Sequence, residues 1–220
     1  MSGHSHFAES VEEYLEAIYR LEREGPGVST SGLASELGVA PASVSGMLKK
    51  LARDGFVTQL SRGNIELTEH GALVGARVVR RHRLAERWLT DVLGIAWDEV
   101  QSEACMLEHA ISDRVEERLS TLLGHPTTCP HGLPIPPRDG SRVERIGAPL
   151  AQFDVGAHVR ICGVTEEVPE MLRYLGDIGM RPGVNVHIRL KAPLGGPITV
   201  AFDDHEHAIS LELARTILAE

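Results

Sequence analysis

The segment 124–149 constrains this chain more than any other feature. It contains six prolines and four glycines. Proline lacks a backbone N–H and fixes φ, and glycine loses more conformational entropy than other residues when it is ordered. Such a composition disfavours long helices and sheet strands. We therefore expect two regions with separate cores, joined by a linker at residues 125–149.

The region before the linker has the spacing of amphipathic helices. Val11, Leu15 and Ile18 recur at helical intervals within a predicted helix at residues 8–24. Further helices are predicted at 30–37, 41–54, 68–93, 97–110 and 112–123. The region after the linker instead has short β-type runs at 159–164, 184–190, 198–202 and 208–211. The expected fold class is mainly α with a small β-barrel domain.

Composition excludes several classes of protein. Of the 220 residues, 42% are hydrophobic, and no run approaches the ~20 apolar residues of a membrane helix. The first residues lack a basic stretch followed by an apolar one, so we expect no secretory signal and no membrane association. The cysteines are three in number and far apart. An odd, scattered set argues against a disulfide framework and for a cytoplasmic location.

Segment 28–67 predicts a winged helix-turn-helix. Two short helices, at 30–37 and 41–54, are followed by two short strands with a turn at 62–64. The whole chain carries a net charge of -9, but residues 28–92 contain nine basic and six acidic side chains. Screening limits charge effects to about 10 Å, so the local charge governs phosphate contacts. The alternative is a helical hairpin used for packing or protein contacts.

The second helix of this motif would enter the major groove of double-stranded DNA. The residues expected at base edges are small, so readout would rest on hydroxyl and methyl contacts. They are Ala40, Pro41, Ala42, Ser43, Ser45 and Gly46. The residues expected at phosphates are Lys49, Lys50, Arg53 and Arg62.

Three groups of residues have the spacing of metal ligands. Cys105, Glu108 and His109 place a thiol, a carboxylate and an imidazole on one helix face. Glu13 and Glu16 form a second group, and His82 and Glu86 a third. Each group has an alternative: a free cysteine is often a small buried apolar residue, and the His82 run could be a solvated face. Cys129-x-His131 could add a ligand pair, but its proline-rich loop argues against this.

The strings RHRLAER at 81–87 and EACMLEH at 103–109 resemble the diphtheria-toxin-repressor and manganese-transport-regulator family of metal-dependent repressors. The start, VEEYLEAIY at 11–19, the CPHGLPIP linker at 129–136 and the DIGMRPG string at 177–183 fit its long members. The resemblance implies a DNA-binding domain at 1–72 and a helical metal-binding and dimerisation domain at 73–124. The linker at 125–149 and an SH3-like (FeoA-like) domain at 150–220 complete this organisation.

The resemblance also implies two metal ions per subunit. The primary site falls on Glu13, Cys105, Glu108 and His109, with Glu16 completing the acidic pair of manganese-type members. The ancillary site falls on His82, Glu86, Gln101, Glu167 and Glu170. Iron-type members have methionine at the position of Glu13 and histidine at that of Gln101, whereas manganese-type members have glutamate at that of Cys105. The primary site is therefore a hybrid.

A carboxylate in place of a thioether favours Mn²⁺, while the thiolate favours Fe²⁺. We expect a manganese-dependent repressor of metal-uptake genes, with iron close behind, that binds operator DNA as a homodimer and is not an enzyme. The alternatives are an iron-dependent repressor of the same family and a winged-helix regulator that senses an organic ligand. A metallohydrolase would need a substrate pocket, and no small organic substrate is expected. The linker could dock on the SH3-like domain or serve as a plain tether.

Overall fold

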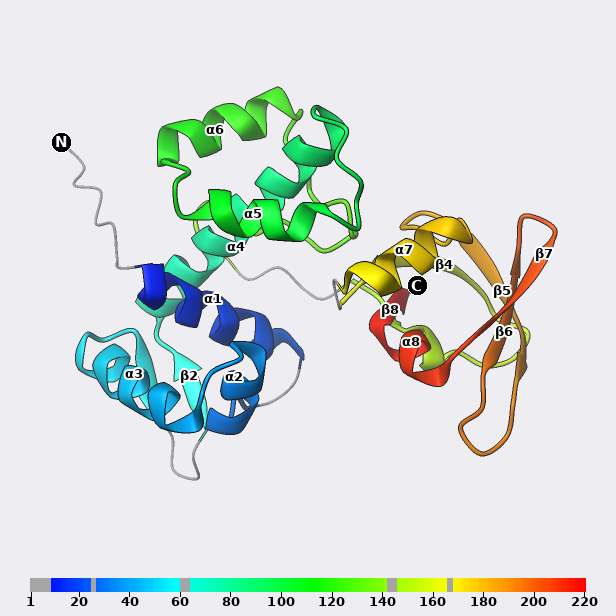
Figure 1. Cartoon of the computed structure of the whole chain (residues 1–220), viewed down its shortest axis with the longest axis horizontal. Helices are drawn as coiled ribbons and strands as arrows, with labels where there is room; N and C mark the ends of the chain where they lie inside the picture. Colours follow the sequence, from blue (N-terminus) through cyan, green and yellow to red (C-terminus); the bar gives the residue numbers. More distant parts are fainter. Residues whose placement is uncertain (1–8, 25–26, 60–63, 142–145, 166–167) are drawn as a thin grey trace. The chain divides into compact units, whose positions relative to one another are not determined.

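The computed structural model describes residues 9–24, 27–59, 64–141, 146–165 and 168–220 (Figure 1). Internal contacts separate the chain into two units. The first contains residues up to 82 together with 107–116 and 136–143. The second contains residues 83–106, 117–135 and 144–220. Helices α4 (Glu69–Asp91), α5 (Val100–Glu108) and α6 (Asp113–Leu122) each contribute residues to both.

The first unit contains the predicted winged helix-turn-helix. Its elements are α1 (Glu9–Glu24), α2 (Thr30–Glu36), α3 (Pro41–Arg53), β1 (Val57–Gln59) and β2 (Ile65–Leu67). Ser29 caps α2, since its hydroxyl accepts a hydrogen bond from the Gly32 amide at 3.0 Å. Pro41 begins α3, where a missing N–H costs nothing. Strands β1 and β2 pair antiparallel with Val57 opposite Leu67, which forms the wing.

Apolar side chains from all these elements form one core. Its fully buried members include Leu15, Ile18, Leu33, Leu48 and Leu51. Two glycines near the start of α4 permit close packing. A Cβ on Gly75 would lie only 2.6 Å from the carbonyl oxygen of Leu15 in α1. A Cβ on Gly71 would overlap the carbonyl oxygen of Phe56. Helix α4 therefore packs directly against the backbone of α1.

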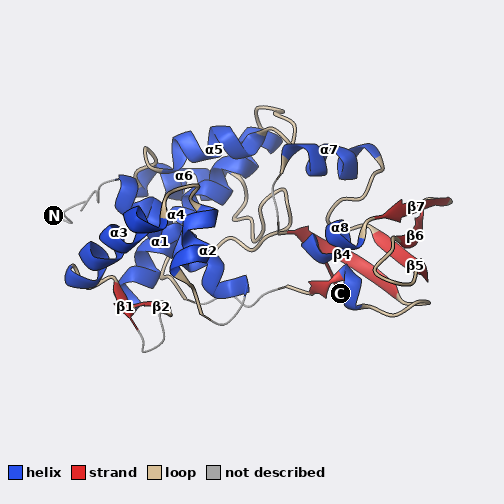
Figure 2. Cartoon of the chain, turned by 60° about the horizontal axis from the view of Figure 1, so that its bottom comes forward, coloured by secondary structure: helices blue, strands red, loops and turns tan. Residues whose placement is uncertain are grey.

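The second unit contains all the strands of the C-terminal region, which Figure 2 shows in red. They form a six-stranded antiparallel sheet in the order β3-β8-β4-β5-β6-β7. The strands are β3 (Ala148–Pro149), β4 (His158–Val164), β5 (Asn185–Lys191), β6 (Ile198–Phe202), β7 (His205–Ile209) and β8 (Ile217–Ala219). The 3₁₀ turn η1 (Leu150–Gln152) and the helices α7 (Pro169–Asp177) and α8 (Leu211–Thr216) connect them. Trp97, which precedes α5, is 3% exposed and belongs to the core of this sheet.

Part of the proline-rich linker docks on this sheet. The Val164 amide of β4 donates a hydrogen bond to the His131 carbonyl oxygen at 2.9 Å. Gly132 follows with φ +84°, and a Cβ there would overlap the carbonyl oxygen of Cys162. At His131 and Gly132 the linker is therefore packed against β4, and the tether alternative is wrong for these residues.

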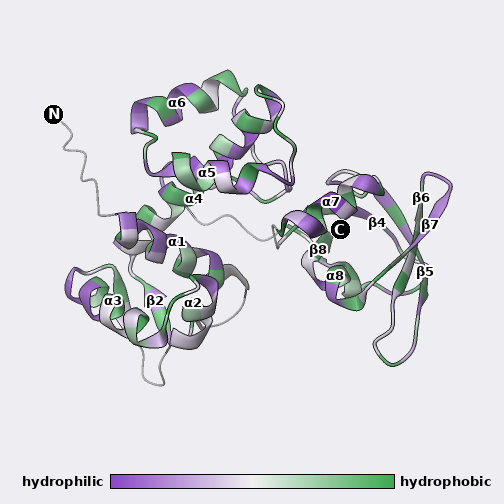
Figure 3. Cartoon of the chain, in the orientation of Figure 1, coloured by the Kyte–Doolittle hydropathy of each residue, from purple (hydrophilic) through white to green (hydrophobic). Residues whose placement is uncertain are grey.

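The fold class is confirmed: a winged helix-turn-helix, a helical region and a C-terminal antiparallel sheet domain. Each predicted helix is present, with ends that differ by up to three residues. Helices α7 and α8 and strands β3 and β8 were not predicted, and the strand predicted at 208–211 is wrong at its end because Ser210 caps α8. Figure 3 shows hydrophilic and hydrophobic residues mixed along α1 and α6. Among the described residues, no helix is long and apolar enough to cross a membrane.

Candidate metal centre

The carboxylate of Glu108, at the end of α5, lies between two histidines. His82 Nδ1 on α4 lies 2.6 Å from Glu108 Oε2, and His109 Nε2 lies 3.2 Å from Oε1. Glu108 and His82 are each only 4% exposed. Two of the sequence-predicted ligand groups, the α4 histidine and the α5 pair, thus lie together.

Helix α1 supplies the acidic side of this cluster. His109 Nδ1 lies 2.8 Å from Glu12 Oε2. Potential ligand atoms of Glu9, Glu13 and His109 lie within 4.8 Å of one another. Glu13 is exposed, whereas Glu12 is 6% exposed. Glu9 and Glu12 were not predicted as ligands. The signal that could have found them is helical spacing, because Glu9 lies four residues before the predicted Glu13 and Glu12 lies four residues before the predicted Glu16.

The network changes the pKa of both central groups. Hydrogen bonds to Glu108 and then to Glu12 raise the pKa of His109 to about 10, against the effect of burial. Burial alone would raise the pKa of Glu108, but the hydrogen bonds from His109 and His82 and their charges lower it overall. Near neutral pH the metal-free cluster is therefore held by a protonated His109 between carboxylates.

The other predicted ligands of α1 and α5 have these positions. Cys105 is exposed, and its Sγ lies within 4.8 Å of potential ligand atoms of His82 and Glu108. Gln101, one turn earlier, is half-buried. Glu16 is 9% exposed and lies 3.9 Å from Arg20 Nη1. It belongs to none of the described groups of three or more possible ligands.

A second cluster lies in the second unit. Glu86 on α4, Cys129 and His131 have ligand atoms within 4.8 Å of one another, and all three are buried. His131 Nδ1 lies 3.1 Å from Glu86 Oε1 and 3.9 Å from Cys129 Sγ. Burial, followed by the charge of Glu86, raises the pKa of the Cys129 thiol. His131 Nε2 donates to the Trp97 carbonyl oxygen at 2.7 Å, which leaves Nδ1 as the possible ligand.

The proline-rich loop of Cys129-x-His131 argues against a ligand pair, yet the structure brings both residues beside Glu86. The missed signal is Gly132, whose docking against β4 fixes the loop beside Glu86. Of the remaining ancillary-site residues, Glu170 is exposed in the first turn of α7, and Glu167 lies outside the described residues.

Helix α3 separates its core residues from its predicted DNA contacts. Val44, Leu48 and Leu51 are buried. The exposed residues are Ala40, Pro41, Ala42, Ser43, Ser45, Gly46, Lys49 and Arg53, and Lys50 is half-buried. The Ser45 hydroxyl donates to the Pro41 carbonyl oxygen at 3.0 Å. Arg53 Nε lies 3.2 Å from Asp54, and Arg62 lies outside the described residues.

The chemistry of both clusters fits a divalent cation. The first cluster offers carboxylates, imidazoles and the thiol of Cys105, and the second offers a carboxylate, a thiol and an imidazole. These are the ligand types of manganese, iron and zinc sites in proteins. In the first cluster His109 contacts the carboxylates of Glu12 and Glu108, which are themselves possible ligands of a cation.

Three family models match consecutive parts of the chain. The N-terminal DNA-binding domain of iron-dependent repressors matches residues 6–63, and their metal-binding and dimerisation domain matches 68–137. The FeoA domain matches 148–220. The iron-dependent repressor IdeR of Mycobacterium tuberculosis is 34% identical over 226 residues, covering 96% of this chain and 97% of that protein. This chain belongs to the iron-dependent repressor family. The expected resemblance, including the C-terminal SH3-like domain, is thereby confirmed.

Other similar proteins are described with different metals, or with none. The diphtheria toxin repressor of Corynebacterium diphtheriae is 33% identical and covers 96% of this chain and 97% of its own. A solved manganese-dependent transcriptional repressor in complex with manganese has a TM-score of 0.88 and 33% identity, covering 95% of this chain and 98% of its own. The structure of ScaR with bound Zn²⁺ has a TM-score of 0.83 and 28% identity, with coverage of 96% and 98%.

The raised pKa of His109 predicts proton release on metal binding. Its folded-state pKa of about 10 lies above the ordinary histidine pKa of 6.5, so the metal-free protein carries this proton near neutral pH. A ligating imidazole must lose that proton. Mn²⁺ binding measured calorimetrically in buffers of different ionisation enthalpy should therefore release about one proton from His109. Parallel measurement on the double variant Cys105→Ser/Cys129→Ser removes the thiol protons of both clusters from the count. Metal binding with no proton release in this double variant would contradict this protonation state.

The raised pKa of His109 also determines how the stability of the folded, metal-free protein changes with pH. The contribution of the protonated network is fully present below pH 6.5 and is lost as the pH rises through about 10. Metal affinity should change in the opposite direction and weaken as the pH falls.

Proposed function

We propose that this protein is a divalent-metal-dependent transcriptional repressor that binds operator DNA as a homodimer, with Mn²⁺ favoured and Fe²⁺ close behind. The observation that carries the proposal is the chain of contacts from Glu12 through His109 and Glu108 to His82. It connects α1, which packs on the winged helix-turn-helix, with α5 and α4. Metal-dependent repressors of the same family support the general function.

The first cluster would control the position of α1. Its carboxylates repel one another unless a positive charge lies between them. In the metal-free protein the proton of His109 supplies one such charge. A bound divalent cation would supply two, with Glu13, Glu108, His109 and Cys105 as its ligands. Fixing α1 would in turn fix the DNA-binding helices that share its core, so metal and DNA would each raise the affinity for the other by the same factor.

The acidic ligands of α1 support Mn²⁺, which prefers oxygen donors. The thiol of Cys105 supports Fe²⁺, which accepts softer donors. Because carboxylates outnumber the single thiol around His109, we favour manganese.

A second ion would bind Glu86, Cys129 and His131. This assignment differs from the expected ancillary site, because Glu86 lies with His131 while His82 contacts Glu108. Two ions per subunit would result. Their ligand sets differ: two carboxylates, one imidazole and one thiol would surround the first ion, and one carboxylate, one thiol and one imidazole the second.

Apolar side chains on the helical region support the homodimer. Val92 and Leu93, just after α4, are 54% and 53% exposed, Met106 on α5 is 66% exposed, and Leu122 on α6 is 64% exposed. Isolated exposed apolar residues are common, but large ones that recur on a dimerisation domain mark a covered surface. A repressor of metal-uptake genes in the cytoplasm, without enzymatic activity, is the function that fits this arrangement.

The hybrid ligand set can be tested by operator binding with Mn²⁺, Fe²⁺, Zn²⁺ or no metal under anaerobic conditions. Chelation should abolish binding by the wild type. Glu13→Met should weaken activation by Mn²⁺ about 10- to 100-fold relative to Fe²⁺, and Cys105→Glu should favour Mn²⁺. Glu103→Met, an exposed change on the same helix as Cys105, is the control. An unchanged metal order in both variants would show that Glu13 and Cys105 are not joint ligands, and DNA binding insensitive to chelation would favour an organic-ligand sensor.

The second ion is tested by stoichiometry. Equilibrium dialysis of the full chain with Mn²⁺ or Zn²⁺ should give two ions per subunit. Cys129→Ser, a nearly isosteric change, should weaken one of the two binding events about 10-fold or more and leave the other unaltered. Cys162→Ser is the matched control, since it is a free cysteine of the same unit outside the cluster. Equal stoichiometry and affinity in both variants would exclude Cys129 as a ligand.

DNA contact by α3 is tested with Lys49→Ala. Lys49 is exposed, so its loss should spare the fold but weaken binding to all duplexes. The slope of log affinity against log salt should fall by about one. Arg189→Ala, at an exposed arginine of β5, should leave both quantities unchanged. A wild-type salt slope in Lys49→Ala would mean that α3 does not lie on the phosphate backbone as proposed.

A further inference from the structure

Two histidines lie side by side on the outer face of the C-terminal sheet, and neither belongs to the two metal clusters. His158 on β4 is directly opposite His187 on β5 in the antiparallel register. Their rings are stacked, with centroids 4.0 Å apart and ring planes at 19° to each other. Successive side chains of a strand point to opposite faces, and the neighbouring Val159 and Val186 are buried in the core. The two imidazoles therefore face solvent, where an ion can reach them.

The strand pairing brings the two side chains as close together as a sheet allows. The Ile188 amide donates a hydrogen bond to the Ala157 carbonyl oxygen at 3.0 Å, so the adjacent pair of opposite residues is the hydrogen-bonded one. The two types of pair alternate along an antiparallel ladder, and the non-hydrogen-bonded type has the shorter separation between opposite residues. His158 and His187 form a pair of this second type. The backbone thus places the two imidazoles next to each other before any ligand binds.

The nitrogens of both rings are available as metal ligands. Neither ring has a hydrogen bond to another described residue. A metal–nitrogen bond of about 2.0–2.1 Å allows one ion to join two nitrogens up to about 4.2 Å apart. Rotation about the Cβ–Cγ bond, a broad torsion in histidine, turns two stacked rings toward a common point. Partial burial, followed by the charges of His158 and Arg189, lowers the pKa of His187, which favours the neutral ring that a metal requires.

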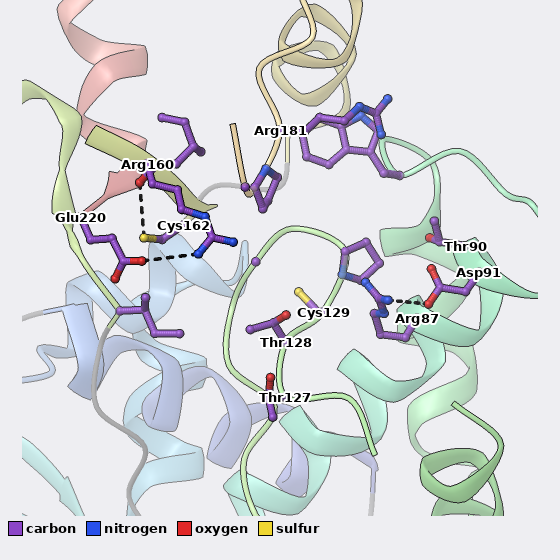
Figure 4. A pocket seen from close by; sticks show the side chains of 17 residues that line it. Arg87, Thr90, Asp91, Thr127, Thr128, Cys129, Arg160, Cys162, Arg181 and Glu220 are labelled. Carbon is purple, nitrogen blue, oxygen red and sulfur yellow. Dashed lines mark hydrogen bonds and ion pairs between the residues drawn. The ribbon is translucent and has the colours of Figure 1, made fainter. Parts of the chain in front are cut away.

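Two arginines flank the histidine pair, and each faces a carboxylate. Arg160 lies 3.8 Å from Glu220, a contact drawn as a dashed line in Figure 4. Arg189 Nε lies 3.6 Å from Glu206. The carboxylates offset the positive charges beside the pair, so the surroundings do not repel a cation. An anion would instead require two protonated rings, whose charges would repel each other at this spacing.

We propose that His158 and His187 form a third metal site, which takes Ni²⁺ or Cu²⁺, with water in the remaining coordination positions. Imidazole suits these ions, and a given site binds both more tightly than Mn²⁺ or Fe²⁺. Two protein ligands hold an ion less tightly than the larger ligand sets of the two clusters, so this site fills after them. Since each strand supplies one ligand, a bound ion ties β4 to β5 on the outer face of the sheet.

The test titrates Ni²⁺ into the full-length, metal-free protein. Histidine rings labelled with ¹³C are followed by NMR, because paramagnetic Ni²⁺ broadens the ring signals of the residues that it binds. His158→Phe and His187→Phe assign the two signals and are also the test variants, since each keeps an aromatic ring in the stack while removing one ligand. His205→Gln, which replaces an exposed histidine of β7, is the matched control. Ni²⁺ binding at the two clusters is seen separately in the signals of His109 and His131.

We expect the His158 and His187 signals to broaden together in one saturable step. In either phenylalanine variant the remaining histidine should need about tenfold more Ni²⁺ or higher, because one ligand of the chelate is gone. His205→Gln should titrate as the wild type does. Amide spectra show whether each variant is folded, and either phenylalanine variant alone suffices for the comparison.

The proposal is overturned if neither signal responds to Ni²⁺. It is also overturned if the remaining histidine of a folded phenylalanine variant titrates as in the wild type, because the pair would then be a packing contact only. The measurement depends on neither of the two clusters. Its failure therefore leaves the repressor proposal intact, and a failure of the operator tests leaves the histidine site intact.

Discussion

The buried carboxylate of Glu108 is the group on which the rest of the metal centre depends. An ionised side chain that is only 4% exposed is costly unless positive partners compensate it. His82 on α4 and His109, the residue after Glu108, are those partners. His109 also contacts Glu12 on α1, so α1 is held to the same cluster. One charge thus sets the side-chain contacts of three helices. Any change in the positive charge around Glu108, by a proton or by a cation, acts on all three contacts.

Most of the helical fold could be predicted because its determinants are local. The 3.6-residue period, Pro41 at the start of α3 and the Thr68 hydroxyl, which accepts from the Gly71 amide at 3.1 Å at the start of α4, all lie within one or two turns. The elements of the C-terminal domain were harder to predict from the sequence, since α8 is a six-residue helix directly followed by β8. A run of Leu, Ala and Ile suits either a buried strand or a short helix. Only pairing with β4 and β3, far away in the sequence, decides between them.

The residues of the metal centre also differ in how far local sequence patterns could predict them. Cys105, Glu108 and His109 were predicted as a group because a helix fixes the spacing of side chains on its own face. Glu12 was missed in favour of Glu13 because helical periodicity alone does not show which acidic residue of α1 reaches His109. The grouping of Glu86 with Cys129 and His131 depends on a loop, and that loop is held by the His131 carbonyl and Gly132 on β4. No local pattern around Glu86 contains this information.

The two clusters differ in how easily a cation could enter. Glu9 and Glu13 are exposed, so ligands of the first cluster reach solvent without any rearrangement. Glu86, Cys129 and His131 are all buried, and the loop that carries two of them is bonded to β4. Exchange at the second cluster would require that loop to leave the sheet, whereas exchange at the first would require only that a cation displace the proton of His109. In the proposed repressor, the first cluster is therefore the one suited to follow changes in metal concentration. The second is suited to hold an ion that stabilises the contact between the linker and the sheet.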